Sequence, residues 1–171
     1  TAPGITRPVT VMADTGTCPY GICAVPSMWV DASDTDGDGN PANEPAVGSS
    51  ILQLTDKSGN ARHFASSSVY QPTLITPPSF AKNVLRFTPA QWMRQDYNFA
   101  SPSTVIYVAR SRTATANRVL TGTSGTWLLG WYGTNREGAA YFGGWVNQPA
   151  NNTVTQKPRI MTAVVSGLGN T

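Results

Sequence analysis

Three aspartates alternate in the segment DASDTDGDGNPANEP, at Asp34, Asp36 and Asp38, and a glycine, Gly39, follows them. Calcium takes about six to eight oxygen ligands, and carboxylates at every second position of a tight loop can converge on one ion. Asn40 is expected to add an oxygen through its main chain. Three carboxylates held close together also repel one another unless a cation lies between them. The spacing therefore predicts a calcium site.

Two interpretations of this acidic loop stay open. It begins like an EF-hand loop, but its twelfth position is Pro45, and the nearest acid, Glu44, comes one residue early. No helical periodicity flanks it. An EF-hand is therefore excluded, and a calcium loop of another scaffold is retained. The alternative is a solvated acidic turn, because Asp, Gly and Asn are also the commonest turn formers.

The segment TDKSGNARH carries Asp56 directly after a predicted strand and before an SGN turn. Aspartate side chains commonly accept hydrogen bonds from the backbone two residues further on. We therefore predict a structural, Asx-type role for Asp56 and no part in catalysis.

Catalysis is not expected from the other acidic residues or from the one histidine. Glycoside hydrolysis needs two carboxyl groups that face each other across a sugar. The only glutamates, Glu44 and Glu137, share no predicted strand. His63 has no GxSxG nucleophile motif to serve, and a lone histidine is more often a packed or surface residue. We therefore predict that the protein is not an enzyme, with a glycoside hydrolase as the remaining catalytic alternative.

Aromatic residues give a hint of binding, because exposed rings stack on the apolar faces of sugars while nearby polar side chains bond the hydroxyls. Most Trp and Tyr side chains are expected in the core, where aromatic residues dominate. The wider set of candidates comprises Trp92, Tyr97, Trp127, Trp131, Tyr132, Tyr141 and Trp145. Those beside loops are favoured, and the predicted ligand-binding residues are Trp92, Tyr97, Tyr132, Asn135 and Arg136.

The two cysteines, Cys18 and Cys23, lie in the segment TCPYGIC. Pro19 and Gly21 favour a turn that brings the sulfur atoms together, so a small surface disulfide is predicted. The alternative is a pair of free thiols in a reducing compartment. One histidine and two cysteines also exclude a four-cysteine zinc site and any site that needs two histidines.

Composition limits both the fold and the partners. Of the 171 residues, 12% are charged and 40% are hydrophobic, and Gly (16) and Pro (13) are plentiful, so long polar helices are not expected. The net charge of +3 comes from basic residues scattered singly along the chain, which does not predict binding to nucleic acid. No apolar run reaches the ~18 residues of a transmembrane helix, so membrane insertion is not expected.

Short runs of β-forming residues between turn residues indicate an all-β fold. Two aromatic runs, WLLGWYG and YFGGWV, are separated by TNREGAA and predict a meander with Trp127, Leu129 and Trp131 on one strand face. Residues 1–26 are predicted to be an N-terminal extension with the disulfide loop, followed by one domain over residues 27–171. The predicted strands are Met28–Asp31, Ile51–Thr55, Val84–Thr88, Thr104–Ala109, Arg118–Thr121, Thr126–Tyr132, Ala139–Val146 and Arg159–Val165.

The segments WVDASDTDGDGNPANEP, LQLTDKSGNARHF, QPTL, LRF, WLLGWYG and YFGGWV together resemble the laminin-G-like branch of the concanavalin A-like lectin/glucanase superfamily. The resemblance covers roughly residues 28–165, and DKSGN is its most specific part. It implies a jelly-roll β-sandwich of two antiparallel sheets. Such modules are usually non-catalytic, occur in secreted, cell-surface and virion proteins, and bind glycans or proteins, often with calcium.

The sequence departs from this family near its end. Family members usually continue past a segment like RIMTAVVSG into several closing strands, whereas this chain stops at Thr171. The resemblance thus implies an open sheet edge with unpaired backbone groups. Three explanations stay open: the chain is a fragment, the N-terminal extension replaces the strands, or a neighbouring subunit of an assembly supplies them.

These observations predict a non-catalytic, lectin-like module with a calcium-stabilised loop. We expect it to recognise a glycan or a surface protein in adhesion, at an extracellular or cell-surface location. The alternative is a structural subunit of a pilus, filament or phage particle, in which the aromatic surfaces make subunit contacts in a virion or fibre.

Overall fold

The computed structural model describes residues 26–78, 80–97, 102–113, 118–122, 127–133, 136–147 and 154–165. Cys18, Cys23 and Asn135 lie outside these ranges, so the disulfide stays a prediction. The described residues contain no helix, and hence none long and apolar enough to cross a membrane. The strand pairs that the structure describes are antiparallel, which confirms the predicted all-β class. The chain divides into two compact units, residues 1–97 and 98–171.

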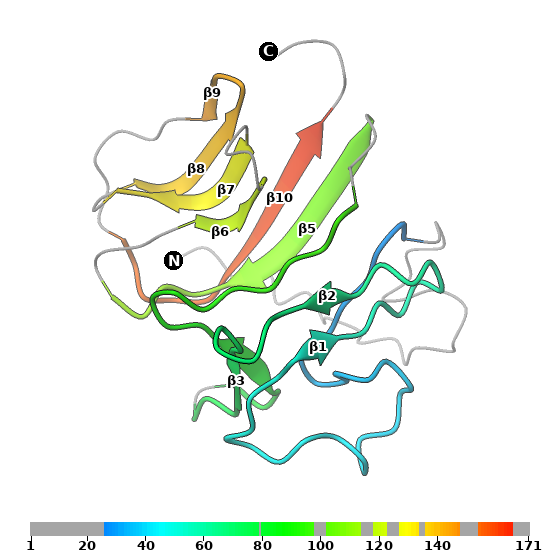
Figure 1. Cartoon of the computed structure of the whole chain (residues 1–171). Helices are drawn as coiled ribbons and strands as arrows, with labels where there is room; N and C mark the ends of the chain where they lie inside the picture. The colour runs from blue at the N-terminus through cyan, green and yellow to red at the C-terminus, as the bar shows by residue number, and fades with distance from the viewer. Residues whose placement is uncertain are drawn as a thin grey trace, which may run out of the picture. The chain divides into compact units, whose positions relative to one another are not determined.

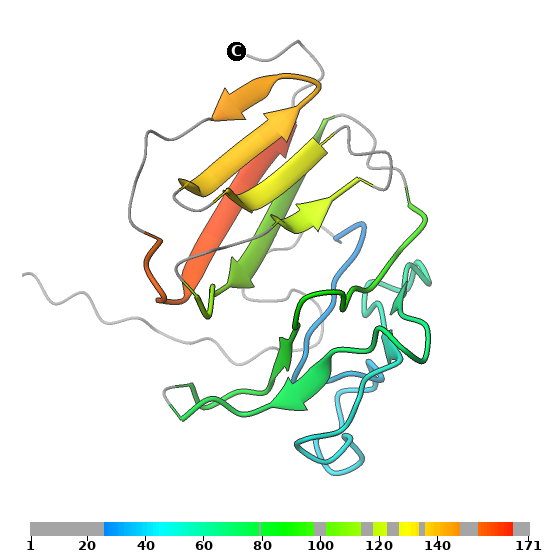
Figure 2. The same cartoon turned by 60° about the vertical axis from the view of Figure 1, so that its left-hand side comes forward.

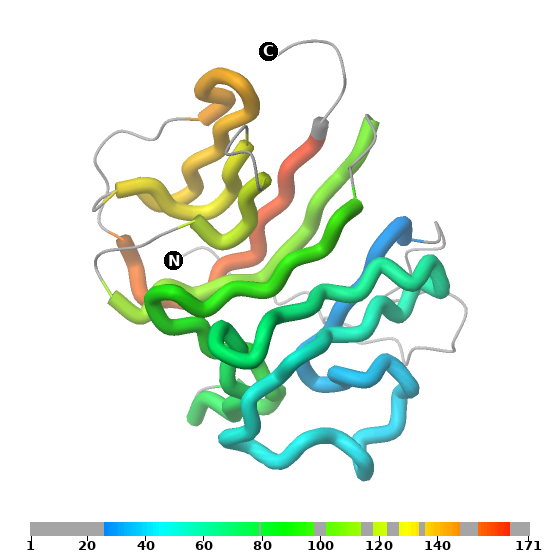
Figure 3. The backbone as a smooth tube through the Cα atoms, viewed as in Figure 1, coloured from blue at the N-terminus to red at the C-terminus, as the bar shows by residue number. Residues whose placement is uncertain are grey.

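The first unit consists mainly of turns and loops, which Figure 3 draws as a winding tube in blue and green. Asp, Gly, Asn, Ser and Pro interrupt each apolar run of this part of the sequence, and these residues favour turns. Its buried hydrophobic side chains include Ile51, Leu54 and Leu74. Its strand pairs are β1 (Gln53–Leu54) with β2 (Phe64–Ala65) and β3 (Thr73–Ile75) with β4 (Val84–Arg86).

The second unit contains longer strands in two sheets. Figures 1 and 2 show the two sheets as separate layers, with β5 and β10 side by side in one of them. The four-stranded sheet has the order β6 (Arg118–Thr121), β7 (Trp127–Tyr132), β8 (Arg136–Phe142) and β9 (Trp145–Asn147). The other sheet pairs β5 (Ser103–Ala109) with β10 (Arg159–Val165).

A hydrophobic cluster joins the two layers. Trp131 of β7 and Val154 are buried together, and Ala109 of β5 and Met161 of β10 pack against them. The Tyr107 hydroxyl donates a hydrogen bond to the Met161 Sδ atom over 2.9 Å. Burial raises the pKa of Tyr107 to about 12, because the charged phenolate is disfavoured away from water. The facing sides of both sheets therefore form the core of this unit.

A charged network also joins the layers. Glu137 of β8 accepts hydrogen bonds from the Thr155 N–H at its Oε2 atom (2.6 Å) and from Arg159 Nε at its Oε1 atom (2.6 Å). Burial alone would raise the pKa of Glu137, but these donors lower it below the ordinary value. Glu137 therefore holds the start of β10 against the four-stranded sheet.

Several predicted strands agree with the structure and others need correction. The bounds of Arg118–Thr121 and Arg159–Val165 are confirmed, and β5 begins one residue before its predicted start. β7 agrees with the prediction over Trp127–Tyr132, and the predicted first residue, Thr126, lies outside the described residues. β2 and β3 were not predicted, because runs of two and three residues carry no readable alternation. The strands predicted at Ile51–Thr55 and Val84–Thr88 shorten to β1 and β4.

Two predicted strands are wrong. Met28–Asp31 forms no strand, since the Trp29 N–H donates to the Asp56 side chain and the Trp29 carbonyl accepts from the Lys57 N–H. Ala139–Val146 is a hairpin of β8 and β9, because Gly143 adopts φ +65° and the Phe142 N–H bonds to the Gly144 carbonyl. The Gly143–Gly144 pair thus turns the chain where a continuous strand was expected.

One extra residue in β8 interrupts its pairing with β7. Gly130 lies opposite Ala139 and Trp131 lies opposite Glu137, so Gly138 has no partner in β7 and forms a β-bulge. Gly138 has φ +83°, a left-handed conformation that favours glycine. The register of β7 with β8 therefore shifts between Gly130 and Trp131.

The predicted grouping of Trp127, Leu129 and Trp131 on one face of β7 stays a prediction, because the register with β8 shifts between Gly130 and Trp131. Trp131 belongs to the buried cluster of this unit, and Leu128 is also buried. Tyr132 lies directly across from Arg136. TNREGAA is not a loop throughout as expected, because β8 already begins at Arg136.

Candidate functional site

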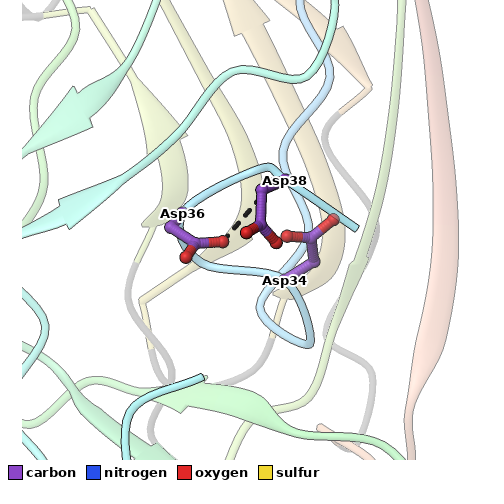
Figure 4. A group of neighbouring side chains, drawn as sticks. All are labelled: Asp34, Asp36 and Asp38. Atoms are coloured by element: carbon purple, nitrogen blue, oxygen red, sulfur yellow. Dashed lines mark hydrogen bonds between the residues drawn. The ribbon is translucent and has the colours of Figure 1, made fainter. Parts of the chain in front are cut away.

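The acidic loop brings Asp34, Asp36 and Asp38 together, as the sequence predicted. One carboxylate oxygen of each residue lies within 4.8 Å of the others. Figure 4 shows the three carboxyl groups turned toward one another, with that of Asp38 between the other two. Asp34 is buried, at 7% exposed, while Asp36 and Asp38 are exposed. The cluster therefore has one closed and one open side.

A backbone N–H group and a lysine side chain bond to Asp34, the buried member of the cluster. Asp34 Oδ2 accepts a hydrogen bond from the Gly39 N–H (3.1 Å) and forms an ion pair with Lys57 Nζ. Burial alone would raise the pKa of Asp34, but these two donors hold it below the ordinary value. Asp34 Oδ1 is buried and has no hydrogen-bond partner among the described residues. This oxygen is therefore a candidate ligand for a cation.

A glycine at a close approach shapes the loop. Gly37 has φ +77°, and a Cβ atom there would lie 2.9 Å from Thr55 Cγ2. The Thr55 N–H donates to the Thr35 carbonyl over 2.8 Å, which brings the two segments together. Only glycine fits this position without a shift of the neighbouring chain.

The exposed aspartates belong to consecutive Asx-type turns. The Asp38 N–H donates to Asp36 Oδ1 (3.3 Å), and the Asn40 N–H donates to Asp38 Oδ1 (2.7 Å). Partial desolvation and the neighbouring carboxylates of Asp38 and Glu44 raise the pKa of Asp36. The Asn40 N–H and the amide of Asn43 lower the pKa of Asp38. A cation would relieve the repulsion at Asp36.

Asn43 is a member of the loop that sequence reasoning missed. Its Nδ2 atom donates to Asp36 Oδ2 (3.0 Å) and to Asp38 Oδ2 (2.7 Å), so it bridges the two exposed carboxylates. Rotation of the amide would present the Asn43 Oδ1 atom in place of Nδ2. The signal that could have found it is its spacing of five residues from Asp38 in the same loop.

Asn40 and Glu44 take other roles in the loop. Asn40 Oδ1 accepts from the Ala42 N–H over 3.1 Å, so its side chain stabilises a turn. Glu44 Oε2 accepts from the Thr35 N–H (2.9 Å) and Thr35 Oγ1 (2.8 Å). Glu44 therefore fixes the loop from inside, while the three aspartates point at one another.

The donor set fits a hard divalent cation. All three converging side chains offer carboxylate oxygens, which Ca²⁺ and Mg²⁺ prefer over nitrogen or sulfur. The unpartnered, buried Asp34 Oδ1 atom adds an independent reason, since a buried carboxylate oxygen is normally bonded. Lys57 supplies a positive charge to the same carboxylate and competes with a metal ion for it.

The predicted structural role of Asp56 is confirmed. Its buried carboxylate accepts from the backbone N–H groups of Trp29 (2.9 Å), Ser58 (3.0 Å) and Arg62 (3.0 Å). Burial alone would raise the pKa of Asp56, but these donors lower it. The Asp56 N–H in turn donates to His63 Nδ1 over 3.0 Å. Asp56 and His63 therefore both have structural partners.

The predicted ligand residues of the first unit have separate partners. Trp92 is 42% exposed, as predicted for a residue beside a loop, and its ring stacks on Tyr70 with centroids 5.2 Å apart. The Tyr97 ring lies 3.6 Å from the guanidinium carbon of Arg62, a cation–π contact. These are two local contacts that involve different side chains.

The second unit carries a cluster of rings on the meander, which we call the aromatic face. Tyr132 and Tyr141 both form T-shaped ring contacts with Trp145, with centroid separations of 5.0 and 5.4 Å. The Arg136 guanidinium carbon lies 6.0 Å from the Trp145 ring centroid. Of these four residues, Tyr132 is the most open at 41% exposed. The aromatic face consists of Tyr132, Arg136, Tyr141 and Trp145.

Strand pairing explains why these side chains gather. Tyr132 lies opposite Arg136, and Tyr141 lies opposite Trp145, and opposed residues point to the same side of a sheet. Two of the residues, Tyr132 and Arg136, belong to the predicted ligand set. Tyr141 and Trp145 were in the wider set of aromatic candidates, but adjacency to loops alone did not select them.

Comparison of the chain with family models, with curated proteins and with solved structures gave no match. The resemblance to the laminin-G-like branch therefore stays a hypothesis that rests on the motifs in the sequence.

Proposed function

We propose that this protein is a non-catalytic recognition module that binds glycans through the aromatic face of β7, β8 and β9. The observation that carries the proposal is the cluster of Tyr132, Trp145 and Tyr141 beside Arg136 on one side of the sheet. Ring faces cover the apolar side of a sugar, and the guanidinium group supplies hydrogen-bond donors for hydroxyl or carboxylate oxygens.

The position of the cluster supports this proposal. The rings lie on paired strands that restrict their positions before a ligand arrives, so less conformational entropy is lost on binding. Trp131 of β7, in contrast, belongs to the buried cluster. An aromatic cluster that the core does not need is a candidate for surface recognition.

A non-catalytic role is supported by the partners of the acidic residues. Glu137 bonds to Thr155 and Arg159, and Asp56 accepts three backbone N–H groups, which occupies both carboxylates structurally. We propose the jelly-roll β-sandwich of the laminin-G-like branch as the complete architecture. The setting that we propose is extracellular or the cell surface, with a virion as the alternative.

Glycan binding can be tested with an array of neutral and anionic glycans. Tyr132→Ala should weaken binding about tenfold or more, as expected for a central aromatic contact. Trp145→Phe should weaken it less, because a smaller ring remains. Val146→Ala is the matched control, since Val146 lies in β9 next to Trp145, is 50% exposed and has no part in the ring cluster. Equal binding by all variants, or no glycan bound by the unchanged chain, would refute the proposal.

We further propose that the acidic loop holds calcium, with Asp34, Asp36 and Asp38 as side-chain ligands and Asn40 as a main-chain ligand. The observation that favours it is the buried, unpartnered Asp34 Oδ1 atom beside two exposed carboxylates. Calcium would supply the positive charge that offsets carboxylate repulsion, and the chain's own residues would hold the loop around it. Its role would be structural.

The calcium proposal predicts a stability difference. A cation that binds only the folded state adds about 2.7 kcal/mol at a concentration ~100-fold above its dissociation constant. Thermal unfolding should therefore occur at a higher temperature with calcium than with chelator, and Asp36→Ala should abolish the difference. Asp96→Ala is the control, because the Asp96 side chain is 73% exposed and pairs with Arg94 outside the loop. An unchanged melting temperature in the original chain would leave the loop as an acidic turn.

A further inference from the structure

The outer edge of β10 is open among the residues that the structure describes. β10 pairs with β5 on one side over all seven of its residues, and no described strand pairs with it on the other. Its sequence after Arg159 is IMTAVV, which contains no charge, glycine or proline. Proteins usually protect such edges with lysine, proline, a bulge or a short strand. β10 has none of these within its paired residues.

The side of β10 that faces away from the core is also apolar. Ile160 and Val164 are 77% and 69% exposed, and they lie on the same face as Ile106 (57%) and Val108 (60%) of β5. The larger exposed fractions of the β10 side chains are expected, because no described strand lies on the other side of β10 to cover them. An unprotected edge with exposed aliphatic side chains is a site for association with another strand.

The sequence of β10 complements itself in one orientation. If two copies pair antiparallel about an axis through Thr162, Ile160 of each copy lies beside Val164 of the other, and Met161 lies beside Ala163. The two Arg159 side chains then lie at opposite ends, about 20 Å apart at ~3.4 Å per residue, which exceeds the ~8 Å screening length. Parallel pairing in register would instead place the two Arg159 side chains together, which is unfavourable.

We propose that β10 pairs antiparallel with β10 of a second copy of this chain, about a two-fold axis through Thr162. The result is a continuous sheet in the order β5, β10, β10 of the second copy and β5 of the second copy. The contact is isologous and closes at two chains, since it uses the one edge of β10 that no described strand covers. This inference does not depend on glycan binding. It describes a specific contact for the alternative function, a structural subunit.

The size of the contact predicts its strength. Two seven-residue strands meet along a strip about 24 Å long, which covers less than the ~1,000 Å² of a stable interface. Main-chain hydrogen bonds and the two Ile160–Val164 contacts must supply the affinity. The dimer is therefore weak and depends on concentration.

Sedimentation equilibrium of the complete chain over a range of concentrations tests the proposal. The average mass should rise from 18.2 kDa toward twice that value. Thr162→Lys places two like charges opposite each other at the axis and should lower the association constant about tenfold or more, with partial recovery at high salt. Thr162→Glu alone should have the same effect, and an equimolar mixture of the two variants should restore the dimer.

Ile106→Lys is the matched control, because it adds the same charge to the same face but on β5, away from the proposed edge. It should leave the association constant nearly unchanged. Loss of the dimer in Ile106→Lys but not in Thr162→Lys would place the contact on the sheet face and overturn the proposal. A mass that stays at one chain at every concentration would also overturn it.

Hydrogen exchange gives a readout that needs no variant. Alternate backbone N–H groups of β10 should become more protected as the concentration of the unchanged chain rises, because they gain partners across the axis. Protection in β5 and in the four-stranded sheet should not change. Exchange in β10 that is independent of concentration would contradict strand pairing.

Discussion

The two units of this chain are ordered by different kinds of hydrogen bond. In the first unit, buried or partly buried carboxylates bind backbone N–H groups, with Asp34, Glu44 and Asp56 each serving a loop. In the second unit, strand ladders provide the regular bonds, and side chains mainly pack between two layers. Stability in the first unit therefore depends on a few individual side chains, whereas in the second it is spread over many residues.

The strongest test of this difference is Asp56→Ala. The substitution leaves three backbone N–H groups without their acceptor, and each unpaired buried group costs about 1 to 3 kcal/mol. We expect a loss of about 3 kcal/mol or more in the free energy of unfolding, measured with denaturant. Asp96→Ala, at an exposed ion pair, should change it by about 0.5 kcal/mol or less. Similar losses in both variants would contradict the special role of Asp56.

The stability of the second unit should be most sensitive to substitutions at positions where the backbone conformation is constrained. Gly130 has φ +122°, and a Cβ atom there would lie 2.7 Å from Val119 Cγ2. Gly130→Ala should therefore cost about 2 to 3 kcal/mol of unfolding free energy. Gly133→Ala is the matched control, since Gly133 has φ +62° but open space around its Cβ position. It should cost only about 1 kcal/mol, and an equal loss would show that the contact with Val119 is unimportant.

Acid should weaken both units, through different residues. The folded-state pKa values of Asp34, Asp56 and Glu137 all lie below their ordinary values of 3.8, 3.8 and 4.5. The unfolded chain thus binds more protons, so this stabilisation is complete above the ordinary pKa values and is lost as the pH falls through the folded ones.

The contribution of Glu137 to this pH-dependent stability can be measured by substitution. Glu137→Gln should lower the unfolding free energy by about 1 to 2 kcal/mol at neutral pH, because a charged acceptor of three donors is replaced by a neutral side chain. Its unfolding free energy should then fall less steeply below about pH 4.5 than that of the unchanged chain. Denaturant titrations at several pH values measure this, and parallel curves for the two proteins would contradict it.

The smallest effect that we predict concerns Lys57, which pairs with Asp34 and lies 4.5 Å from the Trp29 ring centroid. Lys57→Met keeps the apolar stem but removes the cation, so the chain should lose about 1 kcal/mol in the presence of chelator. With calcium the loss should shrink, because Lys57 no longer competes for Asp34. Thermal unfolding under both conditions checks this, and an equal loss in both would argue against competition.

The sequence predicted the strands of the second unit more completely than those of the first. Long strands such as Arg159–Val165 could be located because alternation over seven residues is readable, and the Asx role of Asp56 followed from a known turn chemistry. β2 and β3 were missed because their lengths of two and three residues carry no period. Their positions depend on partners such as Arg94, which bonds to Ala65 from a distant part of the chain.

The candidate sites show the same limit. The convergence of Asp34, Asp36 and Asp38 followed from spacing within one loop. The bridging role of Asn43 and the gathering of Tyr141 and Trp145 beside Tyr132 depend on side-chain direction and on strand register. A register is fixed by contacts across strands, which no single segment of the sequence contains.

The pairing of β5 with β10 also has a consequence for the order of folding. β5 ends at Ala109 and β10 begins at Arg159, so the connection between them contains all four strands of the other sheet. Neighbouring hairpins close short loops and form early, whereas this pair must wait until a long loop is closed. We expect the meander to be the first native structure of its unit and the β5–β10 ladder to be the step that limits the folding rate.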